Sequence, residues 1–285
     1  MNSLTKKLRL TSAGVVLASL CAGGQIASAA SSSPAVASAA PAPDAFTFRL
    51  GGFAVSNIKT ELALSTSNGQ VGDKIEFAKN LGGDDSLNVF RFDGDWRFAA
   101  KHKLQLTYYD INMDASKIIT GAIKWGDVIY PVNTTINSKF QTTIYKLNYA
   151  YTFYRNQTHE INGQIGAHIT SIEAGLSSTN VPKREGVSVT APLPVIGLEW
   201  NAKLSDQFST KVSYQYFGVS LEDDKYSGNL SDFLAVVDYR FHRNWTVGGG
   251  YNRYVIKAAV KGDRPVKLDL KHQYNGLILY VGVNF

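Results

Sequence analysis

Polar and apolar residues alternate along most of the chain. In residues 89–98, VFRFDGDWRF, charged side chains take turns with aromatic ones, and residues 277–285, LILYVGVNF, carry an apolar side chain at nearly every odd position. A period of two is typical of a β-strand whose two faces meet different surroundings. The same alternation recurs in residues 145–153, 161–169, 208–216 and 233–241. Because helical spacing is poor in all of these segments, the pattern predicts an all-β fold.

The connections between the alternating segments differ in length in a regular way. Short polar connections, such as RNQTH at 155–159 and HRN at 242–244, take turns with longer ones, such as residues 114–137. Short turns at one end and longer loops at the other are typical of an outer-membrane barrel. The pattern predicts ten strands, at residues 46–64, 87–98, 102–113, 139–154, 159–175, 190–202, 207–220, 229–241, 244–258 and 267–285. A possible hairpin within 117–130 leaves twelve strands as the alternative.

These features together predict an all-β fold of one class, a transmembrane antiparallel β-barrel with short periplasmic turns and longer extracellular loops. An even number of strands places both termini in the periplasm, and pairing of 267–285 with 46–64 leaves no free sheet edge. The odd-numbered side chains of residues 277–285 are then expected to face lipid.

Two details of the pattern need a local explanation. Leu268, Leu270 and Tyr274 occupy even positions, whereas the apolar residues that follow them occupy odd ones, which predicts a β-bulge near residues 275–276. A proline within a strand cannot donate a ladder hydrogen bond. Pro192 is therefore expected, with Pro194, at the outer end of its strand, above the membrane.

The N-terminal residues indicate the compartment. Three basic residues among the first nine precede a short apolar stretch, and the small residues ASAA at 27–30 supply a cleavage site. This layout predicts a signal peptide at residues 1–29. Residues 30–45, rich in Ala, Ser and Pro, are expected to form a flexible linker, and residues 46–285 the barrel. The predicted location is the bacterial outer membrane.

Composition narrows the classes of function. Without residues 1–29, Lys plus Arg falls from 29 to 26 against 23 Asp plus Glu, so the mature chain is only slightly basic and nucleic-acid binding is not expected. The single cysteine, Cys21, leaves with the signal peptide. The mature chain is therefore expected to have no disulfide and no thiolate ligand.

Four stretches carry a resemblance to a known group of proteins: FRFDGDWRFAAKHKLQLTYYDI, VIYPVNTTINSKFQTTIYKLNYAYTF, TAPLPVIGLEW and GLILYVGVNF. The sequence resembles uncharacterised proteobacterial outer-membrane β-barrel proteins over residues 46–285. The resemblance implies a membrane barrel in the outer membrane. It implies no catalytic residue.

The inward faces of the predicted strands carry charges of both signs. The predicted lumen charge network comprises Arg91, Asp93, Asp95, Arg97, Lys146, Glu199, Lys211, Asp238 and Arg240. One hypothesis is that these charges neutralise one another and fill the lumen of a structural barrel whose outer loops contact surfaces. The other is a narrow polar conduit that selects small solutes. Both describe a non-enzymatic protein, and no cofactor or metal site is predicted.

The alternative function is an outer-membrane hydrolase, a protease or a lipid hydrolase, with a site at the extracellular rim. Its candidate residues are Asp84, Asp85 and His272, but no motif of the ten-stranded outer-membrane proteases accompanies them. The expected partners are outer-membrane lipids and the outer-membrane assembly machinery. The last strand resembles the signal that this machinery reads, with Tyr280 and Phe285 as the candidate residues. The sequence does not indicate an oligomeric state.

Overall fold

The computed structural model describes residues 44–64, 73–179, 181, 185–221, 226–260 and 268–285. The predicted signal peptide and all but the last two residues of the predicted linker lie outside the described residues. Ten long antiparallel strands form the wall, and their bounds are β1 (Phe46–Leu64), β3 (Leu87–Ala99), β4 (His102–Ile118), β7 (Thr135–Arg155), β8 (His159–Ser178), β9 (Glu185–Lys203), β10 (Phe208–Leu221), β11 (Tyr226–Arg240), β12 (Trp245–Val260) and β13 (Leu268–Asn284).

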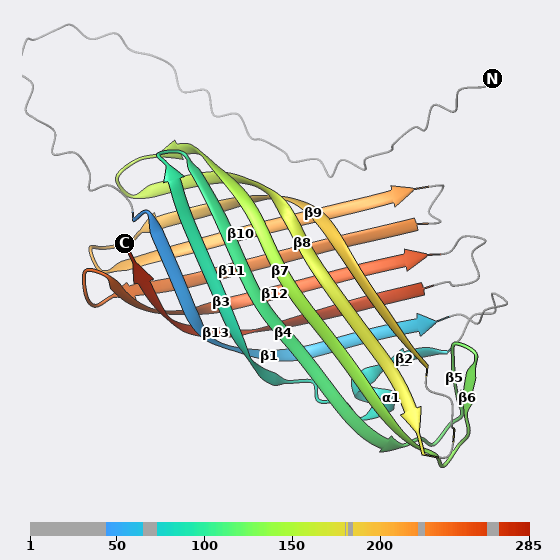
Figure 1. Cartoon of the computed structure of the whole chain (residues 1–285). Helices are drawn as coiled ribbons and strands as arrows, with labels where there is room; N and C mark the ends of the chain where they lie inside the picture. The colour runs from blue at the N-terminus through green and yellow to red at the C-terminus, as the bar shows by residue number, and fades with distance from the viewer. Residues whose placement is uncertain (1–43, 65–72, 180, 182–184, 222–225, 261–267) are drawn as a thin grey trace, which may run out of the picture.

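The wall is a closed barrel. Each strand pairs with its neighbour along the chain, and β13 pairs with β1 over the registers Thr47↔Asn284 to Leu64↔Leu268. The blue and red strands at the two ends of the chain therefore lie side by side (Figure 1). The prediction of a closed antiparallel barrel with ten wall strands is confirmed.

Four short elements lie among the outer connections. The strand β2 (Lys74–Glu76) adds to the outer end of β1, and the helix α1 (Phe77–Leu81) follows it and ends at Gly82, whose φ of 75° lies in the left-handed region. The strands β5 (Ile123–Trp125) and β6 (Val128–Tyr130) form a separate hairpin. The hairpin foreseen within 117–130 therefore exists in the loop and not in the wall, which excludes the twelve-stranded alternative.

The membrane-spanning half of the barrel has an apolar outer surface. On β13 the odd-numbered residues from Leu277 to Phe285 face outward, and Leu279 is 71% exposed. Aromatic and aliphatic residues of the other strands continue this belt, among them Phe48, Trp96, Leu147, Ile196 and Val247. Nine residues at a rise of about 3.3 Å and a tilt of about 40° reach about 23 Å, close to the height of a lipid-facing barrel belt.

Above the belt the two faces exchange their polarity. On β7, the outward residue Tyr145 is followed toward the outer end by Thr143, Gln141 and Lys139, while Phe140 and Ile144 turn inward and are fully buried. The outer half of the barrel thus has a polar exterior and an apolar interior, as a soluble β-sandwich has.

This inversion of the two faces, and not the predicted β-bulge near residues 275–276, explains the change of apolar parity on β13. Leu270, Tyr274 and Ile278 all point inward on even positions, and β13 pairs with β12 without a register shift. The apolar residues change parity because those above the belt pack into an interior core, whereas those within it meet lipid. The irregularity lies instead on β1, between Ser56 and Lys59, where Asn57 takes a φ of 51°.

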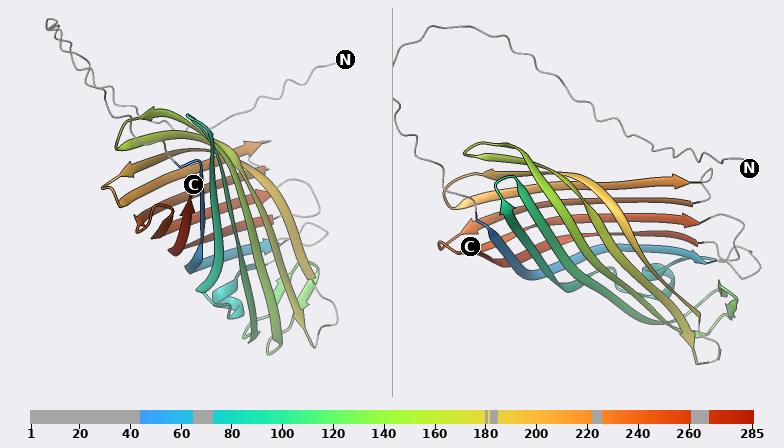
Figure 2. Two further views of the ribbon diagram at one scale, coloured as in Figure 1. Left: turned by 60° about the vertical axis from the view of Figure 1, so that its left-hand side comes forward. Right: turned by 45° about the horizontal axis from the view of Figure 1, so that its top comes forward.

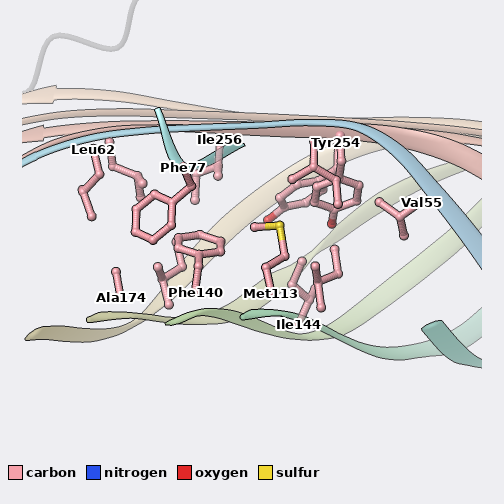
Figure 3. Close-up of a cluster of buried hydrophobic side chains, with 14 of the residues drawn as sticks. Val55, Leu62, Phe77, Met113, Phe140, Ile144, Ala174, Tyr254 and Ile256 are labelled. Carbon is pink, nitrogen blue, oxygen red and sulfur yellow. The ribbon is translucent and has the colours of Figure 1, made fainter. Parts of the chain in front are cut away.

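The core of the outer half lies between two layers of strands. Figure 3 shows Val55, Leu62, Tyr254 and Ile256 descending from one layer toward Met113, Phe140, Ile144 and Ala174 of the other, with Phe77 of α1 between them. Trp125 and Tyr130 of the β5–β6 hairpin are also fully buried in this core. The helix α1 and the β5–β6 hairpin therefore pack into the end of the barrel.

The two layers separate along one seam. Pairing of β9 with β10 ends at Tyr216↔Ile196, whereas β9 stays paired with β8 up to Glu185 and β10 with β11 up to Leu221. Above this point the β10–β13 layer diverges from the β4–β9 layer (Figures 1 and 2). Pro192 and Pro194 lie near the middle of β9 and not at its outer end as predicted. There β9 pairs with β8 alone, so the missing N–H groups cost no bond to β10.

No helix in the described part of the chain is long and apolar enough to span a membrane.

Candidate functional site in the barrel lumen

The periplasmic end of the lumen is a charged vestibule of about 340 Å³. Its central anion is Glu160, the second residue of β8, which lies 2.8 Å from Arg97 and 3.0 Å from Lys103. Arg155 approaches the same carboxylate to 2.6 Å from the end of β7. Three cations on one carboxylate leave this mouth rich in positive charge.

Above the vestibule, charged side chains cross the lumen from wall to wall. Lys103 also contacts Glu199 of β9 at 2.7 Å. Lys211 of β10 contacts Asp95 of β3 at 2.9 Å, and Arg49 of β1 contacts the same carboxylate at 2.6 Å. These pairs are nearly buried, so solvent screens them less than it screens ion pairs on a surface. The Lys103–Glu199 and Lys211–Asp95 pairs hold together strands that are not neighbours in the sheet, whereas Arg49 and Asp95 lie on the neighbouring strands β1 and β3.

A second group of charges lies at the middle of the barrel. Lys146 of β7 donates to Asp232 of β11, and Arg91 of β3 contacts Asp93 at 2.8 Å. Asn252 joins the two pairs, because it accepts from Arg91 at 3.0 Å and donates to Asp232 at 2.7 Å. The cavity beside these groups has a volume of only about 50 Å³. It holds about one or two waters.

An aromatic layer closes the lumen above the charges. Tyr109, Tyr254, Tyr274 and Phe53 are each at most 1% exposed. The phenol groups of Tyr109 and Tyr274 share a hydrogen bond of 2.6 Å. Lys146 Nζ lies 5.2 Å from the Tyr109 ring centroid and 5.5 Å from that of Tyr254, which is cation–π distance. The apolar core of the outer half follows directly above this layer.

The structure brings most of the predicted lumen charges together. Arg91 pairs with Asp93, Asp95 with Lys211, and Lys211 also lies 3.8 Å from Glu199. Of the remaining members, Arg97 pairs with Glu160 in the vestibule, Lys146 pairs with Asp232 at mid-barrel, and Asp238 lies 3.5 Å from Arg49. Arg240 does not join them. It pairs with Asp44 at 2.5 Å at the periplasmic rim, because β11 ends there.

Four charged lumen residues are absent from the sequence-based set: Arg49, Lys103, Glu160 and Asp232. Strand parity was the signal that could have found them, since Arg49 alternates with the outward residues Phe48 and Leu50. Lys103 and Glu160 are the second residues of the predicted strands 102–113 and 159–175, and both begin the inward face of their strand.

The two residues proposed as an assembly signal point in opposite directions. Phe285 is 63% exposed on the outer surface, whereas Tyr280 faces the lumen and donates to Asp238 at 2.7 Å. Tyr280 is thus tied to the lumen charges, and Phe285 belongs to the lipid-facing row.

The residues proposed for a rim hydrolase do not form a site. His272 lies inside the apolar core, fully buried, with its ring 5.1 Å from that of Phe140 and its Nδ1 2.8 Å from Thr60 Oγ1. Asp84 and Asp85 are exposed, and no contact joins either side chain to the histidine within the described ranges. His168 is also buried and bonds Gln215 at 2.6 Å. The described residues contain no group of three His, Cys, Asp or Glu side chains suited to a metal ion.

Comparison of the sequence with models of known families and with curated proteins finds no match. Among solved structures, the chain is similar to the outer membrane protease OmpT from Escherichia coli, with a TM-score of 0.53 at 12% identity over 85% of this chain and 97% of that one. It is also similar to the transport unit of the autotransporter AIDA-I from Escherichia coli, with a TM-score of 0.41 at 6% identity over 88% and 92% of the two chains. OprG from Pseudomonas aeruginosa gives a TM-score of 0.37 at 13% identity over 86% and 96%.

These similarities concern the fold. The closed cylinder, its lipid-facing belt and its inward charges are those of a barrel of the bacterial outer membrane.

Proposed function

We propose that this protein is a non-enzymatic outer-membrane barrel with a sealed lumen, whose outer half is a rigid platform for the extracellular connections. One observation carries the proposal: charged pairs, an aromatic layer and an apolar core succeed one another along the lumen axis, and the mid-barrel cavity is only about 50 Å³. A barrel of this size is usually filled by side chains, whereas open channels belong to larger barrels. The narrow conduit is therefore the weaker of the two non-enzymatic hypotheses.

The length of the projecting half supports the platform role. From Thr135 to Ile144, β7 extends ten residues beyond Tyr145, its last lipid-facing aromatic residue, which is about 33 Å along the strand. A membrane anchor alone needs no such extension. Because the extension has its own apolar core, it holds α1 and the β5–β6 hairpin in a fixed arrangement that a surface partner can recognise.

Planar-bilayer recording tests the seal. The purified mature chain is expected to give no discrete current steps, although protease protection shows that it has inserted. A variant that opens both barriers is expected to conduct, provided that its heat-dependent gel mobility shows it to be folded. It combines Tyr109→Ala, Tyr254→Ala and Tyr274→Ala in the aromatic layer with Phe140→Ala and Ile144→Ala in the core above it. Discrete steps from the wild type, altered in selectivity by Arg91→Ala or Asp95→Ala, would overturn the sealed barrel in favour of the conduit.

The hydrolase alternative has its own test. Peptide and phospholipid substrates are expected to remain intact with the wild type, because His272 is enclosed among apolar side chains and has no acidic partner among the described residues. Hydrolysis that His272→Ala abolishes, in a variant that keeps its fold, would establish the rim enzyme instead.

A further inference from the structure

A cluster of basic side chains lies on the outer surface of β1, β12 and β13, above the lipid-facing belt. Arg253 of β12 is the next outward residue after Tyr251, and Lys59 of β1 lies one row higher, opposite Gln273. Two rows above Arg253, Lys257 and Lys271 lie directly opposite each other on β12 and β13. We call Lys59, Arg253, Lys257 and Lys271 the basic collar.

The collar is not neutralised by the protein. Lys271 contacts Glu61 at 3.3 Å, but Glu61 also binds Lys74 at 2.5 Å. Within the described ranges, Lys59, Arg253 and Lys257 make no ion pair. Other acids lie nearby: Glu76 and Asp269 on the same outward face, and Asp85, whose backbone carbonyl accepts from the Ile58 N–H at 3.0 Å beside Lys59. Among the described residues, none of these carboxylates forms an ion pair with a collar residue. Like charges directly opposite on a sheet destabilise it, so the Lys257–Lys271 pair costs stability unless an anion lies between them.

The opposite wall lacks this feature. At the same height on β4, β7 and β8 the outward charges are Asp110, Asp114, Lys139 and Glu173. Lys139 lies opposite Asp114 in the register, and Asp110 accepts from Thr143 at 2.7 Å. Acids therefore exceed bases there. Among the described residues, the side formed by β1, β12 and β13 therefore differs in charge from the side formed by β4, β7 and β8.

The height of the collar points to its partner. At about 3.3 Å per residue and a tilt of about 40°, Arg253 lies about 5 Å and Lys257 about 15 Å above Tyr251 along the membrane normal. The headgroup layer of a bilayer is about 5–8 Å deep on each side. Arg253 therefore reaches the level of lipid phosphates, whereas Lys257 and Lys271 lie above a simple phospholipid headgroup, even when their side chains bend back toward it.

We infer that the basic collar binds an outer-leaflet glycolipid whose phosphate groups are carried on a saccharide headgroup. Such a headgroup extends its charges through the height that the collar spans. A phosphate monoester, with a charge of about −1.5 to −2, neutralises the facing Lys257–Lys271 pair. The collar then fixes this side of the barrel to the surrounding lipid.

The test uses the folded mature chain in neutral zwitterionic micelles, to which lipid A, phosphatidylglycerol or inorganic phosphate is added. Binding is followed by native mass spectrometry and by the unfolding temperature. Lysine-to-glutamine changes at both 257 and 271 are expected to weaken lipid A binding at least about tenfold, since each basic group near an anionic surface is worth about fivefold. Lys139→Gln, at similar height on the opposite wall, is expected to bind like the wild type.

The double variant Lys257→Gln, Lys271→Gln also separates binding from a general folding defect. In lipid-free micelles it is expected to unfold close to the wild-type temperature, because removal of the like-charge pair offsets the loss of the surface Lys271–Glu61 contact. With lipid A it is expected to unfold below the wild type. Equal binding by the two proteins overturns the inference. If phosphatidylglycerol raises the wild-type unfolding temperature as much as lipid A does, the assignment to a glycolipid is overturned. If inorganic phosphate does so, the assignment to a lipid is overturned.

Discussion

Tyr280 of β13 lies over Gly248, its register partner on β12, so closely that a Cβ at position 248 would come within 2.5 Å of the tyrosine ring. The other register partner of Tyr280, on β1, is Gly51, where a Cβ would lie 2.6 Å from the tyrosine Cβ. A glycine on each side gives the ring room inside the lumen and lets it reach Asp238.

Gly248→Ala is therefore expected to destabilise the barrel by about 1–3 kcal/mol, because the added methyl group displaces Tyr280 from its place over β12. Denaturant unfolding in micelles measures the change. Gly52→Ala is the matched control, since a Cβ at that outward position meets nothing within 4 Å. If the two variants lose the same stability, steric crowding by Tyr280 is not the cause.

Loss of one member of the buried Lys146–Asp232 pair is expected to be costly. Lys146→Met leaves Asp232 charged and buried without its cation, which costs about 3–5 kcal/mol. The double variant Lys146→Met, Asp232→Leu is expected to lose much less, because no unpaired charge remains. The unfolding free energies of the wild type, Lys146→Met, Asp232→Leu and the double variant form a double-mutant cycle. Additive losses would show that the two residues act independently.

The apolar core of the outer half is expected to contribute to global stability. Phe140→Ala removes a ring that lies 5.2 Å from Phe77 and 5.1 Å from His272, and such a cavity costs about 3–5 kcal/mol. Ile129→Ala serves as the control, because Ile129 is 62% exposed on the β5–β6 hairpin. A Phe140→Ala protein with wild-type unfolding would mean that the outer half unfolds separately from the barrel.

The upper edge of the lipid belt can be located by introducing a charge at each of two positions on the same face of β13, one charge per variant. Val281→Arg places a cation at the middle of the β13 belt and is expected to cost about 2–4 kcal/mol in phospholipid vesicles. Gln273→Glu, eight residues away on the same outward face and opposite Lys59, is expected to cost almost nothing. Comparable losses from both variants would place lipid well above Leu277 and contradict the assigned belt.

Most of the wall could be predicted from the sequence, because a β-strand between two different surroundings has to alternate. The predicted and observed bounds of β1 coincide at 46–64, and those of β9 differ by five residues at its start. Parity also identified most lumen charges. Arg49, Lys103, Glu160 and Asp232 also lie on inward faces, so the same alternation could have identified them.

The outer half could not be predicted in the same way. Alternation shows that two faces differ but does not say which face meets lipid and which meets protein. On β13 the change of apolar parity between Tyr274 and Leu277 resembles a bulge when the chain is taken alone. The packing of α1 and the β5–β6 hairpin into the core depends on contacts between distant segments, which no local pattern records.

The inversion of the two faces has a consequence for where this protein can reside. A hydrophobic thickness greater than the belt would immerse Asp110, Lys139 and Arg253 in hydrocarbon, and a smaller one would leave Leu277 and Leu147 in water. Both mismatches are unfavourable, and a filled barrel with an internal core cannot easily tilt or flatten to relieve them. The chain is therefore matched to a thin bilayer and should be excluded from thicker ones.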